Sequence, residues 1–190
     1  MKRKNQVILI ASFVPFCWLA FMALHELGHM IAGLTTGGNV TKVVLHPFAI
    51  SRTDVSPNSN PLAVVWAGPI IGVILPLTIW GLFRKFKIPG DYLARFFAGF
   101  CLIANGAYIG IGSFGNIGDA GDMMKNGSPI WLLWLFGVIT VSIGFYIWHR
   151  LGPKFGLGES NGRVDEWAAY VSLGLFTVLF LATFLTSPRF

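Results

Sequence analysis

Five long apolar runs restrict what this chain can fold into. They cover approximately residues 7–35, 61–83, 93–114, 129–148 and 167–186. A helix needs about 20 residues to cross roughly 30 Å of hydrocarbon, and each run is close to that length or longer. Of the 190 residues, 54% are hydrophobic and only 12% are charged, a balance that excludes an ordinary soluble globular domain. We therefore predict an all-α fold, a single domain (residues 1–190) that forms a polytopic transmembrane bundle of about five helices.

The connection after the first run differs from the other connections. Residues 37–50 begin with turn-forming glycines and are rich in β-branched side chains, which is typical of a short β-hairpin. Residues 52–61 contain several turn formers, so a solvated loop is expected there. His46 is a possible metal ligand, although a single loop histidine beside a proline is more often ordinary surface chemistry. The core of the domain is expected in residues 7–124, with accessory helices in residues 129–186.

Glycines mark two places where the helices are unusual. Gly68 and Gly72 lie four residues apart, a pattern that favours close approach of the second helix to a neighbour. Five more glycines follow, the first at Gly106 and the last at Gly118, so we do not expect a regular helix through to Gly118. Backbone broken at membrane depth is tolerated where it lines protein or a watery cavity. The predicted break leads directly into an acidic residue, Asp119.

The basic residues are distributed as in a membrane protein. The net charge of +6 comes from short clusters between the apolar runs, so no nucleic-acid partner is predicted. Residues 2–4, 84–87 and 150–163 hold three Lys or Arg each, whereas residues 36–60 and 115–128 hold two and one. This asymmetry favours a cytoplasmic N-terminus and a multi-pass protein in the lipid bilayer, which in a prokaryote is the cell membrane.

The sequence His25-Glu26-Leu27-Gly28-His29 lies near the end of the first run. Helical residues four apart share a face, so both imidazoles can bind one Zn²⁺ while Glu26 acts as a general base on water bound to the metal. The alternative is a pair of histidines satisfied within the bundle, with Glu26 paired to one of them. The motif follows 18 uncharged positions, and three ionisable groups there would be costly in a bilayer without compensation. A metal ion supplies that compensation.

A catalytic zinc normally has three protein ligands and one water, so one ligand is still needed. Asp119 and Asp122 follow the predicted break in the third helix, and being three apart they can share a helix face. Spacing therefore does not choose between them. The alternative role for either aspartate is to cap the start of a helix.

In these motifs the chain resembles the site-2 protease family of membrane-embedded zinc metalloproteases. Residues 25–29 match the HExxH signature, Ala67-Gly68-Pro69 is similar to the small-residue motif on the following helix, and Asp119-Ala120-Gly121 resembles the later Asp-Gly ligand motif. The resemblance covers about residues 20–124. It implies that Asp119 is the third ligand, with Asp122 as the alternative. The family usually has an asparagine upstream of this aspartate, so the resemblance makes Asn105 and Asn116 candidate substrate-binding residues.

The resemblance implies hydrolysis of a peptide bond in or near a transmembrane segment of a membrane protein substrate. Glu26 would take the proton of the zinc-bound water and later return it to the leaving nitrogen. The substrate helix must unwind locally, and the predicted hairpin could hold it as an added strand. Two alternatives are a zinc-dependent membrane hydrolase of a lipid amide and a non-catalytic metal-binding membrane protein. The glutamate of the motif argues against the second, because a purely coordinating site needs no base there.

Overall fold

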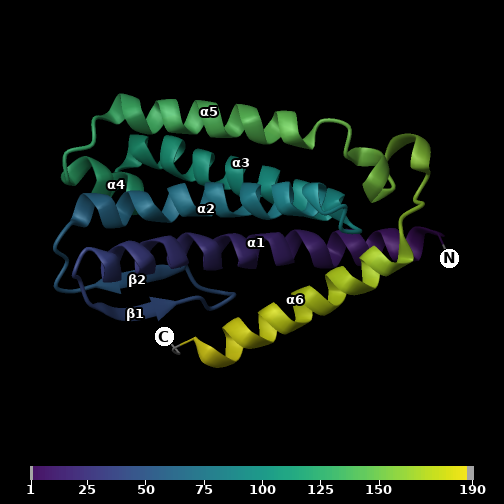
Figure 1. Ribbon diagram of the computed structural model, residues 1–190, viewed down its shortest axis with the longest axis horizontal. Coiled ribbons are helices and arrows are strands. Elements are labelled where there is room, and N and C mark those ends of the chain that lie inside the picture. Colours follow the sequence, from purple (N-terminus) through teal and green to yellow (C-terminus); the bar gives the residue numbers. More distant parts are fainter. Residues whose placement is uncertain (1, 188–190) are drawn as a thin grey trace.

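The computed structural model describes residues 2–187 and shows an α-helical bundle with one small β-hairpin (Figure 1). Within these residues, five helices are long and apolar enough to cross a membrane. They are α1 (Lys2–Thr35), α2 (Pro61–Lys85), α3 (Asp91–Gly115), α5 (Ile130–Trp148) and α6 (Glu166–Thr186). The prediction of an all-α bundle with a short hairpin after the first helix is confirmed.

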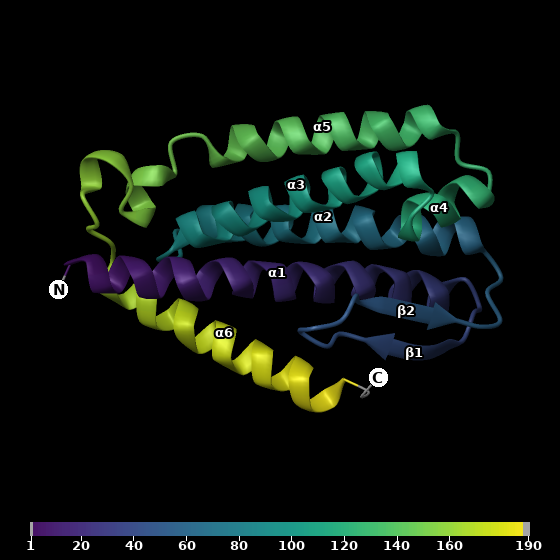
Figure 2. The ribbon, with the colours of Figure 1, turned by 180° about the vertical axis from the view of Figure 1, so that it is seen from behind.

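Helix α1 lies in the middle of the molecule. Figure 1 shows α2 and α3 on one side of it, with α5 beyond them, and the hairpin and α6 on the other side; Figure 2 shows the same order from behind. Large apolar side chains of α1 form the main core with residues of α3 and α6, which include Leu9, Phe13, Cys17, Phe97, Cys101, Ala168 and Ala169. Burial of this apolar surface holds the bundle around α1.

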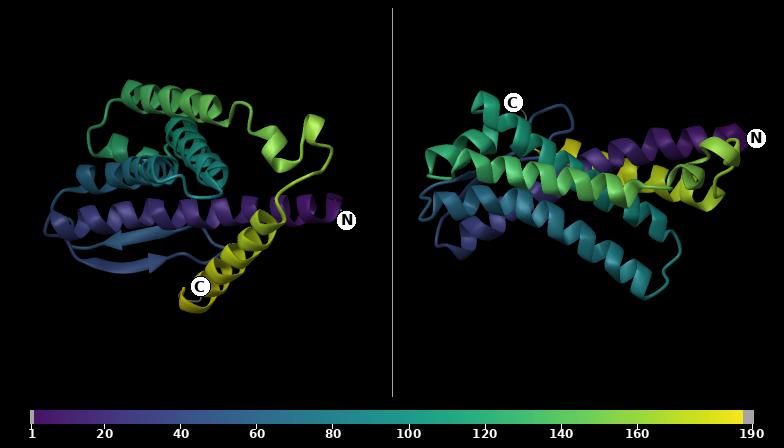
Figure 3. Two further views of the ribbon diagram at one scale, coloured as in Figure 1. Left: turned by 45° about the vertical axis from the view of Figure 1, so that its right-hand side comes forward. Right: turned by 90° about the horizontal axis from the view of Figure 1, so that it is seen from above.

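The two accessory helices cover different parts of the core. Helix α5 packs along α3, where Gly137 lies so close that an added Cβ would be 3.0 Å from the Gly106 carbonyl oxygen. Helix α6 starts beside the N-terminal half of α1 and diverges from it toward the hairpin (Figure 3). Its end reaches the hairpin, because the Leu45 amide donates a hydrogen bond of 2.8 Å to the Ser187 hydroxyl.

Strands β1 (Val40–Val44) and β2 (Arg52–Val55) form an antiparallel hairpin beside the C-terminal half of α1 (Figure 1). The prediction of a solvated loop from residue 52 onward is therefore wrong for residues 52–55. The side chains of residues 52–55 alternate between the two faces of the strand. Val55 packs against α1 at Gly33, whereas Arg52 and Asp54 are exposed and paired with each other. One face of the strand is buried on the helix, and turn-forming composition alone does not show this.

Helix α3 ends at Gly115, and the chain breaks before α4 (Gly118–Lys125). Asn116 caps α3 in the left-handed conformation, with φ 52° and ψ 41°, and Ile117 is extended. Gly118 also has a positive φ, and its missing Cβ leaves room for the Tyr108 hydroxyl. The expectation that a regular helix does not continue through Gly118 is confirmed. The break turns the chain so that Asp119 lies in the first turn of α4, opposite α1.

Candidate metal centre

His25, His29 and Asp119 come together at one point, although the aspartate is about ninety residues further along the chain. His25 Nε2 lies 2.6 Å from Asp119 Oδ2, and His29 Nε2 lies 3.2 Å from the same oxygen. The three potential ligand atoms lie within 4.8 Å of one another. Both imidazoles are buried and the Asp119 side chain is 22% exposed. The i, i+4 spacing on α1 places the two histidines on one face, and the break after α3 brings in the carboxylate.

The second nitrogen of each imidazole is bound to an oxygen. His29 Nδ1 lies 2.8 Å from the Val64 carbonyl oxygen, and His25 Nδ1 lies 2.8 Å from Asn105 Oδ1. A carbonyl oxygen only accepts, so in each neutral ring Nδ1 carries the proton and Nε2 has a lone pair. The amide of Asn105 donates to the Cys101 carbonyl, which places its oxygen toward His25. Both Nε2 lone pairs therefore face Asp119.

Two lone pairs and a carboxylate facing one another repel unless a cation lies among them. A cation there would also favour the ionised form of Asp119, because a nearby positive charge stabilises a carboxylate. Two imidazole nitrogens and one carboxylate oxygen are a donor set typical of catalytic zinc, and the oxygens behind Nδ1 are the partners that such histidines usually have. These residues fit a Zn²⁺ ion.

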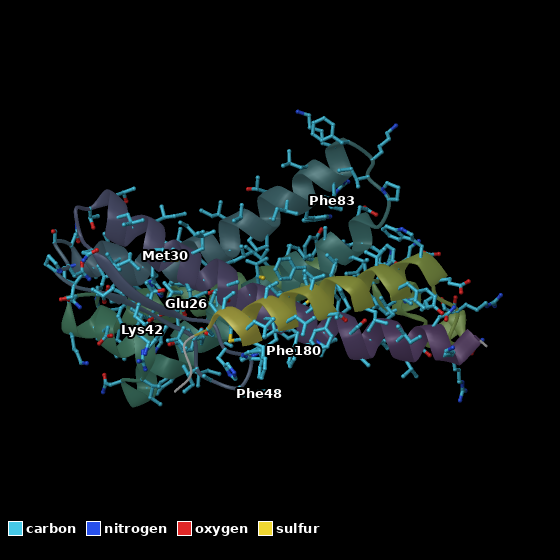
Figure 4. All side chains as sticks on the ribbon, turned by 90° about the horizontal axis from the view of Figure 1, so that it is seen from below. Glu26, Met30, Lys42, Phe48, Phe83 and Phe180 are labelled. Carbon is cyan, nitrogen blue, oxygen red and sulfur yellow. The ribbon has the colours of Figure 1, made fainter. Side chains whose placement is uncertain are left out.

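Glu26 lies beside this group and is not part of it. Its side chain is buried on α1, and its Oε2 accepts a hydrogen bond of 2.8 Å from the Thr53 hydroxyl of β2. Figure 4 shows Glu26 on the part of α1 that the hairpin covers. Nothing in the sequence marked Thr53 for this position, since the hairpin was expected to end before it. The only local signal that could have found it is the alternation in residues 52–55.

A cavity of about 1140 Å³ opens onto the site. Its walls include the His25, Glu26 and His29 side chains of α1, Asp119 of α4 and the hairpin residues 47–56. Apolar side chains such as Trp18 and Phe21 line it further along α1. A concave, largely apolar space with a few convergent polar groups is the usual form of a ligand site.

The glycines of α2 make room for the side chains of the candidate metal centre and for Asn105. A Cβ at Gly68 would overlap the ring of His29, and a Cβ at Gly72 would lie 2.8 Å from Asn105 Nδ2. At Gly28 of α1 a Cβ would overlap the Ala67 carbonyl oxygen. The expected close approach at Gly68 and Gly72 is therefore observed, and it accommodates the histidine His29 and the asparagine that orients His25.

The other candidate residues lie around this centre. Asp122 lines the outer cavity with a 57% exposed side chain and pairs with Lys125 at 3.0 Å. Asn105 is fully buried behind His25, whereas Asn116 is exposed at the end of α3. A substrate-binding role for either asparagine stays a prediction. His46 is buried in the hairpin loop, with its ring centroid 5.3 Å from that of Phe184 of α6, and lies outside the ligand group.

Comparison of the chain with protein-family models, with curated proteins and with solved structures finds no match. The family resemblance carried by the three motifs thus stays a prediction. The geometry of the site is the basis on which a function can be inferred.

Proposed function

We propose that this protein is an intramembrane zinc metalloprotease that hydrolyses a peptide bond in or near a transmembrane segment of a membrane protein substrate. One observation carries the proposal: His25, His29 and Asp119 converge on one point while Glu26, a buried carboxylate outside that group, lines the same cavity. Zinc held by the three ligands would activate a water and polarise the scissile carbonyl. Glu26 would be the base.

Glu26 has the features that proton transfer needs. Its Oε2 is held by Thr53, and within residues 2–187 its Oε1 has no hydrogen bond. During hydrolysis a bond forms between the water oxygen and the carbonyl carbon, and the carbon–nitrogen bond of the peptide breaks. Glu26 accepts the proton that the water loses and delivers it to the leaving nitrogen. Catalysis by one carboxylate in both roles requires no further titratable group.

The position of the site supports a membrane-embedded substrate. The ligands follow 18 uncharged residues of α1, and the surrounding helices are long and apolar enough to span a bilayer. We propose a multi-pass integral membrane protein with a cytoplasmic N-terminus, located in the cell membrane in a prokaryote. A polypeptide chain reaching the site must have an unwound backbone, because a helix hides its carbonyl groups.

The two alternatives make different demands on the site. A metal-binding protein without turnover has no use for a buried carboxylate beside the ligands, so Glu26 argues against it. A hydrolase of lipid amides would use the same four residues, and the apolar wall of the cavity suits an acyl chain. The two hydrolases differ in substrate and not in chemistry, so activity measurements separate them.

The test compares the wild-type protein with Glu26→Gln, both purified in detergent and loaded with zinc. The substrates are fluorescein-labelled casein, which is unfolded, and labelled single-pass transmembrane peptides. We expect cleavage by the wild-type protein and a rate at least about 100-fold lower for Glu26→Gln, with equal zinc content. Glu159→Gln, at an exposed glutamate of the 149–165 connection, is the matched control and should keep full activity.

Cleavage by Glu26→Gln at the wild-type rate would overturn the assignment of the base. If the wild-type protein cleaves a fluorescent N-acyl amide lipid but neither polypeptide, the lipid-amide alternative replaces the protease. If it cleaves none of these substrates although zinc is bound, the proposal of an enzyme is wrong.

A further inference from the structure

We infer that Thr53 of the hairpin is a positioning residue for the reaction, and that its hydroxyl holds the Glu26 carboxylate in the orientation in which it works as a base. The inference rests on the proposed function. It makes the hairpin a part of the catalytic centre as well as a wall of the cavity.

The contact between the two residues is direct and isolated. Thr53 Oγ1 lies 2.8 Å from Glu26 Oε2 and 3.4 Å from the Glu26 carbonyl oxygen, so the single hydroxyl proton is donated to the nearer, charged oxygen. Within residues 2–187, this is the only hydrogen bond to the Glu26 carboxylate. The Glu26 residue is only 3% exposed, which limits what water can contribute. The orientation of a buried carboxylate thus depends on one partner.

The packing of the hairpin on α1 determines where the Thr53 hydroxyl lies. Thr53 and Val55 are two apart in β2 and so share the face toward α1. Val55 Cγ2 would be 3.0 Å from a Cβ at Gly33, so the glycine lets the strand lie close to the helix. On the opposite face Arg52 and Asp54, whose side chains are 60% and 44% exposed, form an ion pair. The strand therefore keeps Thr53 and Val55 on the face toward α1.

The β-branch of threonine makes it well suited to hold the Glu26 carboxylate. The branch restricts χ1, so little rotational freedom is lost when the hydroxyl is held against Glu26. Glutamate itself has three rotatable side-chain bonds, and a general base must lie within hydrogen-bond reach of the proton that it takes. Binding of one oxygen by Thr53 leaves the other for that proton.

The test measures kcat and KM of zinc-loaded variants in detergent, with whichever polypeptide the wild-type protein cleaves, fluorescein-labelled casein or a labelled transmembrane peptide. Thr53→Val keeps the shape of the side chain and removes the donor, whereas Thr53→Ser keeps the hydroxyl. Thr41→Val is the matched control, because Thr41 is a hairpin threonine that donates to the Asp54 carbonyl, 3.1 Å away. We expect Thr53→Val to lower kcat by about 10- to 100-fold with KM within about 2-fold of the wild-type value. Thr53→Ser should regain most of the kcat, and Thr41→Val should match the wild-type protein.

A general structural defect would give another pattern. The variants would lose zinc, or Thr53→Val, Thr53→Ser and Thr41→Val would all show the same loss of kcat. Either that pattern or a wild-type kcat for Thr53→Val overturns the inference while leaving the proposed function intact. Absence of cleavage of both casein and the transmembrane peptides by the wild-type protein would instead contradict the proposed function, and the role of Thr53 would fall with it.

Discussion

Asn105 and His25 are joined by a hydrogen bond of 2.8 Å between the amide oxygen and Nδ1, although 80 residues separate them in the sequence. Asn105 is fully buried, and its nitrogen donates to the Cys101 carbonyl one turn earlier in α3. The oxygen therefore has one orientation, and the proton of His25 must lie on Nδ1. Helix α3 thus sets the tautomer of a histidine on α1, which leaves Nε2 available to a metal.

We predict that Asn105→Leu lowers the zinc affinity of the purified protein by about 10- to 100-fold, because His25 loses the acceptor that orients it. Leucine is similar in size to asparagine, so the contact between the helices is kept. Asn105→Asp retains an oxygen at this position and should bind zinc nearly as well as the wild-type protein. Competition with a chromogenic chelator measures the affinities. Equal affinity for Asn105→Leu and wild type would rule out this role.

The second prediction concerns the choice between the two aspartates. His25→Ala, His29→Ala and Asp119→Ala each remove one of the three converging ligand atoms, so the zinc content should fall from about one per chain to near zero after dialysis. Asp122→Ala is the matched control. Its carboxylate is exposed and pairs with Lys125, and its loss should leave zinc in place. Metal analysis of the purified variants decides the matter, and loss of zinc from Asp122→Ala alone would reverse the assignment.

The local sequence predicted that the two histidines of α1 share a face, but it did not predict the residues that bind them. Spacing of four residues is enough to place two histidines on one helix face, because helix periodicity is a local property. The choice of Asp119 over Asp122 came only from the family resemblance, since it depends on where the chain turns after Asn116. The oxygens that orient the histidines come from α2 and α3. Only the packing of three helices brings these oxygens to the histidines.

The fold was predictable where hydrophobicity alone decides it. Five apolar runs became five helices, with ends that differ by a few residues because polar residues such as Lys2–Asn5 extend α1 beyond its apolar part. The second strand was missed because Arg52 and Asp54 are polar and pair on the exposed face. Its inner face is buried against Gly33, a contact between segments about twenty residues apart. Thr53 could not be identified as a partner of Glu26 without that contact.

The third prediction uses two glycines of the same helix. A Cβ at Gly68 would overlap the ring of His29, whereas at Gly81 nothing lies within 4 Å. Gly68→Ala should therefore displace the imidazole or separate α1 from α2, and the zinc content should fall to less than about half. Gly81→Ala should keep zinc and leave the melting temperature unchanged or slightly higher, because alanine favours helix. Metal analysis and thermal unfolding of both variants provide the comparison.

A wild-type zinc content in Gly68→Ala would contradict the close packing at this position. Loss of zinc from both variants would instead indicate that α2 as a whole does not tolerate alanine, and the specific effect on His29 would be refuted.

The last prediction concerns orientation in the membrane. The N-terminus, the turn between α2 and α3 and the connection between α5 and α6 lie at one end of the bundle, and the hairpin and α4 lie at the other (Figures 1 and 2). Cysteines introduced at Lys87, Glu159 and Ser59 sample both ends. Because the native Cys17 and Cys101 are buried, they should not react with a membrane-impermeant maleimide.

In intact cells we expect labelling at position 59 alone, and labelling at positions 87 and 159 only after the membrane is opened. The basic clusters at the N-terminal end predict this pattern, since Lys and Arg are enriched in cytoplasmic loops. The reverse pattern would place the metal site near the cytoplasmic surface, and labelling of both ends in intact cells would contradict a bundle that spans the bilayer.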